Sequence, residues 1–312
     1  MSKMIATRDA YGEALVELGA ENGNVVVLDA DLSGSTKTSG FAKNFPERFF
    51  NMGIAEANMI GTAAGLAAGG KVPFASTFAI FAVGRAWEQV RQSVAYPKAN
   101  VKIVATHSGV TVGEDGGSHQ SVEDIAIMRA VPNMTVIVPA DGVETKLAIR
   151  AAAAYNGPVY VRLGRNKVPT LFDEKYDFAI GKGCQLRGGS DLTFVTTGLM
   201  TAPAVAAADL LAAQGISARV VHIATIKPLD EELIVAAARE TGAIVTAEEH
   251  SIIGGLGGAV AELLSDRFPV PVKRVGVQDR FGTSGKAEEL VKYFGLTAEN
   301  LVDAAKEVLL KK

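Results

Sequence analysis

The chain has 312 residues, 48% of them hydrophobic and 21% charged, which excludes wholesale disorder and indicates two domains. Lys and Arg number 31 against 34 Asp and Glu, so the net charge of −3 excludes the basic field of a nucleic-acid-binding protein. The single cysteine, Cys184, excludes an internal disulfide, and we expect a cytoplasmic protein.

Short β-branched runs alternate with alanine-rich helical periods along the first half of the chain, which predicts a parallel α/β sheet. Thr7 is the expected N-cap of the first helix. The stretch 167–187 contains Pro169 and two glycines and is predicted to be irregular. The predicted strands are 25–28, 72–75, 101–106, 135–138 and 159–163, and the predicted helices are 7–18, 56–68, 86–95 and 142–154.

A second α/β series follows, with strands predicted at 192–197, 218–223, 243–247 and 272–276 and helices at 202–214, 231–240, 258–265, 287–293 and 298–310. The expected fold is therefore two consecutive three-layer α/β domains with mainly parallel sheets. We place them at residues 1–168 and 187–312, joined by a linker at 169–186.

No segment predicts membrane insertion. The longest weakly charged stretch, 56–85, is interrupted by Lys71, Pro73 and several glycines, and the N-terminal residues lack the apolar run of a signal peptide. A bilayer span needs about 20 consecutive apolar residues. We expect neither a membrane partner nor a nucleic-acid partner.

Polar residues follow three of the predicted strands. Ligands of open parallel sheets bind beyond the carboxyl ends of the strands, so these residues predict a site. Two histidines in one glycine-rich loop strengthen this prediction, although a single loop histidine is usually a bystander. The residues are Asp31 and Ser35 after 25–28, His107, Asp115 and His119 after 101–106, and Arg165 after 159–163.

Glu56 and Arg8 each allow two interpretations. Glu56 opens a helix whose next residues, 57–70, carry no charge; it is either a carboxylate favoured by the helix N-terminus or a carboxyl held in apolar surroundings. Arg8 lies in the first turn of a helix, where a cation is disfavoured, so either Asp9 or an anionic ligand compensates it. The uncharged segment 57–70 predicts a helix buried on all sides, as at a subunit interface. His222 and His250 are expected to be structural.

Four blocks of sequence together resemble transketolase. They are FNMGIAEANM at 50–59, STFAIF at 76–81, GEDGGSHQ at 113–120 and DRFGTS at 279–284. Full-length transketolases have three α/β domains, and the first carries a Gly-Asp-Gly motif that this sequence lacks. The chain therefore resembles the C-terminal subunit of a split transketolase, with a pyrimidine-binding domain followed by the transketolase C-terminal domain.

The resemblance implies roles in binding thiamin diphosphate. Glu56 matches the glutamate that hydrogen-bonds a ring nitrogen of the aminopyrimidine and favours its imino tautomer. Phe81 matches the aromatic residue stacked on that ring, and Phe78 a neighbouring wall. Asp31 corresponds to a carboxylate near the cofactor.

The resemblance also implies roles toward the sugar. His119 matches a residue that contacts the reacting end of the donor and assists proton transfer, and Asp115 matches a carboxylate that recognises an adjacent hydroxyl. Four further residues match the cluster that grips the sugar phosphate: Arg8, Ser35, His107 and Arg165.

By resemblance the chain is part of an enzyme of carbohydrate metabolism, in the pentose phosphate pathway. It would transfer a two-carbon ketol unit from a ketose phosphate to an aldose phosphate through a thiamin diphosphate ylide. We expect Mg²⁺ or Ca²⁺ to be held mainly by an N-terminal partner subunit, with no metal ligand on this chain. Two copies of each subunit would form a heterotetramer.

Three alternatives remain. Deoxyxylulose-phosphate synthase shares the Gly-Ile-Ala-Glu block but typically has Asp-Arg-Ala-Gly where this chain has Thr-His-Ser-Gly at 106–109. The β subunits of 2-oxoacid dehydrogenases share the glutamate but lack the paired histidines and phosphate-binding arginines. A non-catalytic regulatory homologue is the third, and the retained polar set argues against it. The preferred sugar phosphate, the metal and the partner chain stay open.

Overall fold

The structure is a computed structural model that describes residues 3–173 and 175–312. A seven-stranded sheet is the framework of its first half. The strand order is β12-β6-β7-β5-β4-β2-β3, and only the β12–β6 pair is antiparallel. Because β12 comes from the second half of the chain, the two halves are joined through this sheet. The strands are β2 (Val25–Asp29), β3 (Phe49–Asn51), β4 (Val72–Phe78), β5 (Lys102–Thr106), β6 (Thr135–Ile137), β7 (Val159–Arg162) and β12 (Thr225–Lys227).

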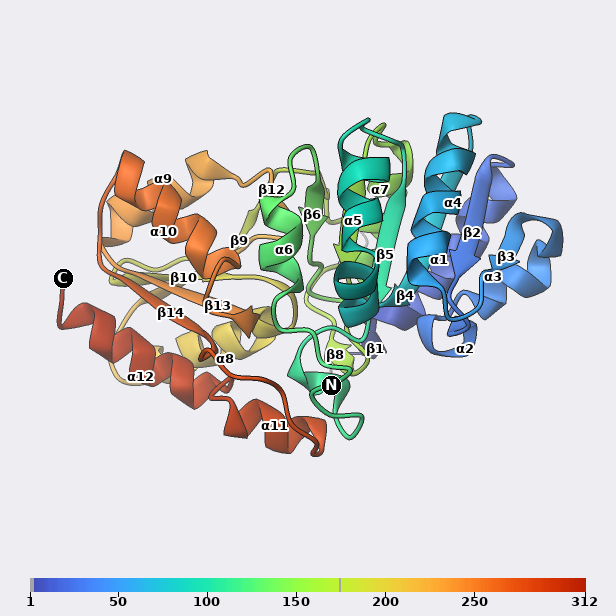
Figure 1. Ribbon diagram of the computed structural model, residues 1–312. Coiled ribbons are helices and arrows are strands. Elements are labelled where there is room, and N and C mark those ends of the chain that lie inside the picture. The colour runs from blue at the N-terminus through green and yellow to red at the C-terminus, as the bar shows by residue number, and fades with distance from the viewer. Residues whose placement is uncertain (1–2, 174) are drawn as a thin grey trace.

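Helices cover both faces of this sheet because its strands are apolar on both sides (Figure 1). In β2, Val25 and Val27 pack in one cluster with Tyr11, whereas Val26 and Leu28 pack with Met59 on the other face. The strand alternation thus yields the predicted three layers. One face is covered by α1 (Thr7–Glu21) and α7 (Gly142–Ala154), the other by α4 (Glu56–Ala68) and α6 (Asp124–Ala130).

The second half forms a five-stranded sheet of order β14-β13-β10-β11-β9, parallel except for β9. Helices again lie on both faces, so the expected fold class is confirmed. The strands are β9 (Cys184–Arg187), β10 (Leu192–Thr196), β11 (Ala218–His222), β13 (Ile244–Ser251) and β14 (Val272–Val277). The helices are α8 (Thr201–Ala212) and α12 (Ala298–Leu309) on one face, and α9 (Glu231–Thr241) and α10 (Leu256–Arg267) on the other.

Short elements differ most from the sequence prediction. The stretch predicted to be irregular contains β8 (Lys167–Pro169), which pairs antiparallel with β1 (Met4–Ala6), and also contains β9. These strands and β12 form because distant segments offer backbone partners, which local sequence does not reveal. The remaining short helices are α2 (Ser33–Thr36), α3 (Ser39–Asn44), α5 (Trp87–Gln89) and α11 (Ala287–Tyr293).

Two helical predictions need correction. The N-cap of α1 is Ala6, because the Thr7 hydroxyl lies inside the helix and bonds Gly164 instead. The helix predicted at 86–95 is only α5, flanked by the π-helical turns Phe81–Arg85 and Val90–Ala95. The burial of α4 on all sides at a subunit interface stays a prediction, since within this one chain Asn58 and two small residues of its outer face are exposed.

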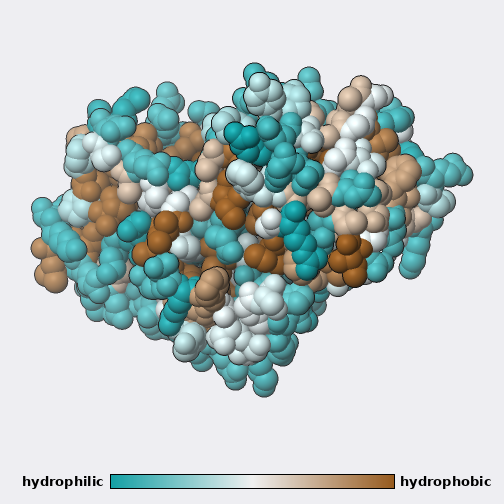
Figure 2. Space-filling view, viewed as in Figure 1, coloured by the Kyte–Doolittle hydropathy of each residue, from teal (hydrophilic) through white to brown (hydrophobic). Residues whose placement is uncertain are grey.

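Apolar side chains reach the surface in separate patches among polar ones on the face seen in Figure 2. Over the described residues the most exposed large apolar side chains include Phe281 (88%), Tyr96 (80%) and Ile54 (75%). None of the described helices has the length and apolar character needed to cross a bilayer.

Candidate functional site

The predicted site lies where parallel strands of the first sheet end. Asp31 follows β2 directly and Ser35 lies in the short helix α2 that comes next, the end of β4 contributes Phe78, and His107 follows β5 directly. Arg165 lies just beyond β7. Glu56 reaches the same region as the first residue of α4. The carboxyl edge of the sheet therefore gathers residues that are up to 134 positions apart in the sequence.

Glu56 is a buried carboxylate beside an aromatic face. Its side chain is 4% exposed, and its Oε1 lies 3.0 Å from Nη1 of Arg85. The Arg85 guanidinium also lies over the Phe81 ring, 4.0 Å from the ring centroid. Phe81 and Phe78 are stacked with centroids 5.8 Å apart. A flat ring that donates N–H groups would find both a stacking surface and an acceptor here.

Two histidines flank these phenylalanines. The His107 ring stacks on Phe78 with a centroid distance of 3.8 Å. The His119 ring meets Phe81 edge-on at 5.4 Å and Phe78 at 6.2 Å. Its Nδ1 lies 3.0 Å from the Ser118 hydroxyl. The glycine-rich loop after β5 thus brings both predicted histidines to one aromatic wall.

The contacts of His107 define its tautomer. Nε2 lies 3.2 Å from Arg8 Nη1, and Nδ1 lies 2.8 Å from the Thr106 hydroxyl. Because a guanidinium can only donate, Nε2 accepts and Nδ1 carries the proton. Burial, followed by the positive charges of Arg8 and Arg165, lowers the pKa of His107 to about 3. His107 is therefore a neutral acceptor at physiological pH, held at a strained φ of 56°.

Arg8 is anchored but has spare donor capacity. Its Nη1 donates to the backbone oxygen of Ser35 at 3.0 Å, while its buried Nε has no hydrogen-bond partner in the described chain. Burial lowers the pKa of Arg8, and the nearby charge of Arg165 acts in the same direction. Two cations that disfavour one another across a partly buried site form a natural anion-binding pair.

Arg165 is the second cation of this pair. Its Nη1 donates to the Val112 carbonyl at 2.6 Å and lies 3.4 Å from Asp115 Oδ2. It lines an open groove of about 750 Å³ that also borders Gly113. Asp115, which was predicted to recognise a sugar hydroxyl, is exposed and lies beside Arg165, which was predicted to bind the sugar phosphate.

Two predicted residues lie at the margin of the cluster. Asp31 is exposed at a φ of 64° and accepts a hydrogen bond from Asn51 Nδ2 at 3.0 Å. Ser35 contacts Arg8 through its backbone oxygen rather than its hydroxyl. Neither contact places these side chains directly against the aromatic wall.

Sequence reasoning missed Arg85 and gave no role to Asp29. Arg85 is the first charged residue after Lys71, and this isolation in an uncharged stretch was the available signal. Asp29 is fully buried and accepts from the hydroxyls of Thr36 and Thr38 at 2.6 and 2.9 Å, which fixes the loop containing Ser35. Burial raises the pKa of Asp29, and the two threonine hydrogen bonds oppose this.

The other two histidines lie away from the site. His222 is buried between Glu144 Oε2 at 2.8 Å and the Thr201 hydroxyl at 2.9 Å. His250 Nε2 accepts from the Ala126 backbone at 3.3 Å. Within residues 3–173 and 175–312, no group of three His, Cys, Asp or Glu side chains could hold a metal ion.

Comparison with known protein families gives two matches. Residues 3–170 match the transketolase pyrimidine-binding domain, and residues 181–301 match the transketolase C-terminal domain. The two matches together span most of the chain.

Individual relatives agree. A protein of Methanocaldococcus jannaschii whose name refers to a transketolase C-terminal section is 56% identical over 308 residues, covering 98% of this chain and 96% of that protein. A 6-deoxy-6-sulfo-D-fructose transketolase subunit of Clostridium sp. strain MSTE9 is 47% identical, covering 98% of this chain and 95% of its own length. A solved split-gene transketolase, described as an inactive β4 tetramer, has a TM-score of 0.93 and 58% identity and covers 99% of both chains.

Proposed function

This chain belongs to the transketolase family, and we propose that it is the C-terminal subunit of a split enzyme whose thiamin diphosphate site is completed by a second chain. The aminopyrimidine ring would bind to this chain. The diphosphate, with Mg²⁺ or Ca²⁺, would bind mainly to an N-terminal partner subunit. The active complex would be a heterotetramer with two copies of each chain.

One observation carries the proposal: the buried Glu56 carboxylate lies beside the Phe81 ring face. Both groups already engage the flat guanidinium of Arg85, which donates to Glu56 while lying over Phe81. An aminopyrimidine is likewise flat, stacks on an aromatic ring and presents polar edge atoms to a carboxylate. The residues present therefore fit this half of the cofactor.

Bound thiamin diphosphate would supply the carbon nucleophile that carries the two-carbon unit between sugars. Glu56 would hold a proton at the ring nitrogen, and Phe81 and Phe78 would fix the ring plane. His119, edge-on to Phe81, would move a proton at the hydroxyl or carbonyl oxygen of the donor sugar. Asp31 would contribute a carboxylate at the cofactor side.

The anionic end of the sugar would bind between Arg8 and Arg165. The neutral His107 orients Arg8, and the loop of Ser35 supports it from the other side. Asp115 would leave Arg165 to contact a sugar hydroxyl when the anion binds. Phosphate is the ligand expected for ketose and aldose phosphates of the pentose phosphate pathway. Because one relative is named for 6-deoxy-6-sulfo-D-fructose, we extend the proposed class to sugars that carry a sulfonate in place of the phosphate.

Several features support a partner subunit. The relatives named as a section and a subunit match this chain over nearly their whole length, and the similar β4 tetramer is inactive in that state. Exposed apolar residues lie just before Glu56, among them Ile54 at 75% exposure and Phe50 at 38%. The open face of α4 adjoins them. We propose that the partner and a second copy of this chain cover these surfaces in a cytoplasmic complex.

Cofactor titration tests this proposal. Thiamin diphosphate and Mg²⁺ are added to the purified chain alone and to the chain mixed with its N-terminal partner subunit, and binding is followed by calorimetry. We expect tight binding only in the mixture, with one site per copy of this chain. Equal affinity with and without the partner would contradict the shared site.

A further inference from the structure

The loop between β5 and α6 carries His107, Asp115 and His119, and the C-terminal domain holds this loop from behind. Ser251 donates a backbone hydrogen bond to the Val122 carbonyl at 2.7 Å. The Gln120 side-chain amide donates to the Thr283 carbonyl at 2.9 Å. Both partners lie more than 120 residues away along the chain, so the shape of the loop depends on the second domain.

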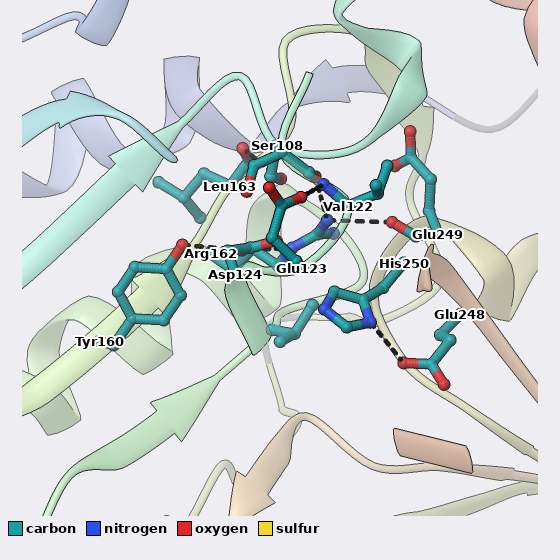
Figure 3. Close-up of polar contacts among 12 residues, drawn as sticks. Ser108, Val122, Glu123, Asp124, Tyr160, Arg162, Leu163, Glu248, Glu249 and His250 are labelled. Atoms are coloured by element: carbon teal, nitrogen blue, oxygen red, sulfur yellow. Dashed lines mark hydrogen bonds and ion pairs between the residues drawn. The ribbon is translucent and has the colours of Figure 1, made fainter. Parts of the chain in front are cut away.

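Two adjacent glutamates of β13 point in different directions (Figure 3). Glu248 accepts from the backbone N–H groups of Leu256 and Gly257, at 2.7 and 2.8 Å, at the start of α10 in its own domain. Glu249 instead accepts from the Thr111 backbone N–H at 2.7 Å, inside the loop between β5 and α6. Successive side chains of a strand face opposite sides, which explains the division.

Glu249 fits closely against the loop backbone. A Cβ added at Gly109 would lie 2.3 Å from the Glu249 carboxyl carbon, and Gly109 has a φ of 75°. Glu249 is 4% exposed. Burial raises the pKa of Glu249, while the positive charge of Arg162 opposes this. The close fit leaves the loop little freedom at this point.

Arg162 ties the same region to β7. It is buried, its Nε lies 2.8 Å from Asp124 Oδ2, and its Nη2 donates to the Glu249 backbone oxygen at 2.9 Å and to that of Ser121 at 3.3 Å (Figure 3). Asp124 also accepts from the Tyr160 hydroxyl at 2.7 Å. The backbone that carries Glu249 is therefore fixed relative to the first sheet.

The segment that Glu249 holds in turn places Arg165. The 3₁₀ turn Val110–Val112 offers its carbonyls outward: Asn166 Nδ2 donates to Thr111 O at 3.0 Å, and Arg165 Nη1 donates to Val112 O at 2.6 Å. A contact chain thus runs from Glu249 through Thr111 and Val112 to Arg165.

We infer that Glu249 is a positioning residue of the C-terminal domain that sets the anion-binding end of the active site by fixing the turn that holds Arg165. The inference rests on the proposed function for its kinetic consequence. Its structural consequence, how firmly the loop between β5 and α6 is held, can be measured by hydrogen exchange even if the enzyme shows no activity.

The test compares variants of the two glutamates in the complex with the partner subunit. Glu249→Asp withdraws the acceptor from Thr111, and Glu249→Met removes it at similar length, while Glu249→Gln keeps an acceptor. Glu248→Asp is the matched control. The readouts are amide hydrogen exchange of the peptide covering 108–114, and KM and kcat with a ketose phosphate and with an unphosphorylated donor.

Loss of one such hydrogen bond predicts roughly five- to ten-fold faster exchange of that peptide in Glu249→Asp and Glu249→Met. KM for the ketose phosphate should rise by a similar factor, with kcat and KM for the unphosphorylated donor within about two-fold. Glu249→Gln should restore both values, and Glu248→Asp should change neither.

Wild-type exchange in both Glu249 variants, or the same changes in Glu248→Asp, would overturn the inference. If one Glu249 variant does not fold, the other decides. Faster exchange together with equal rises in KM for both donors would also overturn it. A wild-type complex without ketol transfer would count against the proposed function alone, because the exchange comparison would still report whether Glu249 orders the loop.

Discussion

Arg85 and Glu56 form an ion pair at the centre of the site, with Nη1 of Arg85 3.0 Å from Oε1 of Glu56. The same guanidinium lies 4.0 Å from the Phe81 ring centroid. It therefore engages the two residues proposed to hold the aminopyrimidine. Since the Arg85 side chain is 51% exposed, it can leave toward solvent when the ring binds.

Arg85→Ala should tighten cofactor binding in the complex with the partner. The cofactor then no longer displaces an existing contact, and a half-exposed ion pair contributes about 0.2–1 kcal/mol, up to about five-fold in affinity. Calorimetric titration of thiamin diphosphate measures the change. Weaker binding in the variant would show instead that Arg85 supports the bound ring.

Glu56→Gln should nearly abolish turnover while leaving the fold intact. Glutamine keeps the size but is a poor proton acceptor, so activation at the ring nitrogen is lost. The rate of hydrogen–deuterium exchange at C2 of the bound cofactor is the measurement, and circular dichroism controls for folding. An unchanged C2 exchange rate would show that Glu56 does not activate the ring.

Arg8→Ala and Arg165→Ala should act on substrate affinity. Each arginine would make charge-assisted hydrogen bonds to the sugar anion, worth about 1.5–3 kcal/mol, so KM for a phosphorylated ketose should rise roughly ten-fold or more. KM for an unphosphorylated donor should change much less. Initial-rate kinetics with both donors measures the difference.

Arg150→Ala is the matched control for these variants. Arg150 pairs with Glu17 and Glu21 on the surface between α1 and α7, at 2.9 and 2.8 Å, away from the site. We expect wild-type kinetics for both donors. Equal rises in KM for phosphorylated and unphosphorylated donors in the Arg8 and Arg165 variants would contradict the anion role.

His107 should make the chain less stable toward acid. Its folded pKa is about 3 against an ordinary value of 6.5, so below pH 6.5 the unfolded chain binds a proton that the folded chain does not. This contribution to the free energy of unfolding is complete above pH 6.5 and falls, by up to about 1.36 kcal/mol per pH unit, as the pH drops toward 3.

Urea unfolding of the wild type and His107→Asn at pH 7 and pH 5 isolates this effect, because other titrating groups are common to both proteins. The wild type should lose more stability than the variant between the two pH values. Identical losses would mean that His107 takes up a proton in the folded chain as readily as in the unfolded chain.

The longer strands of both sheets and their order along the chain were predictable because a buried parallel sheet requires continuous apolar runs. The same rule placed Asp31, His107 and Arg165 at one edge of the sheet, and the structure puts them there. Local sequence could not reveal β12 or β9, since each strand is three or four residues long and exists only through pairing with a distant strand.

The supporting contacts were equally hidden. Glu249 is separated from Thr111 by 138 positions, and nothing in its own strand indicates that it faces another domain. Arg85 reaches Glu56 from the π-helical turn Phe81–Arg85, which lies just before the helix predicted at 86–95. The roles assigned by resemblance to Glu56, Phe78, Phe81 and His119 remain predictions, although the structure brings their side chains together.

The most direct test of the central claim is a titration of ketol transfer. Transfer of the two-carbon ketol unit from a ketose phosphate to an aldose phosphate is measured with this chain at fixed concentration. Thiamin diphosphate and Mg²⁺ are in excess, and the N-terminal partner subunit is added in increasing amounts. We predict background activity for the chain alone and a rise that saturates at one partner per chain. Full activity without the partner, or none at any ratio, would contradict the shared site.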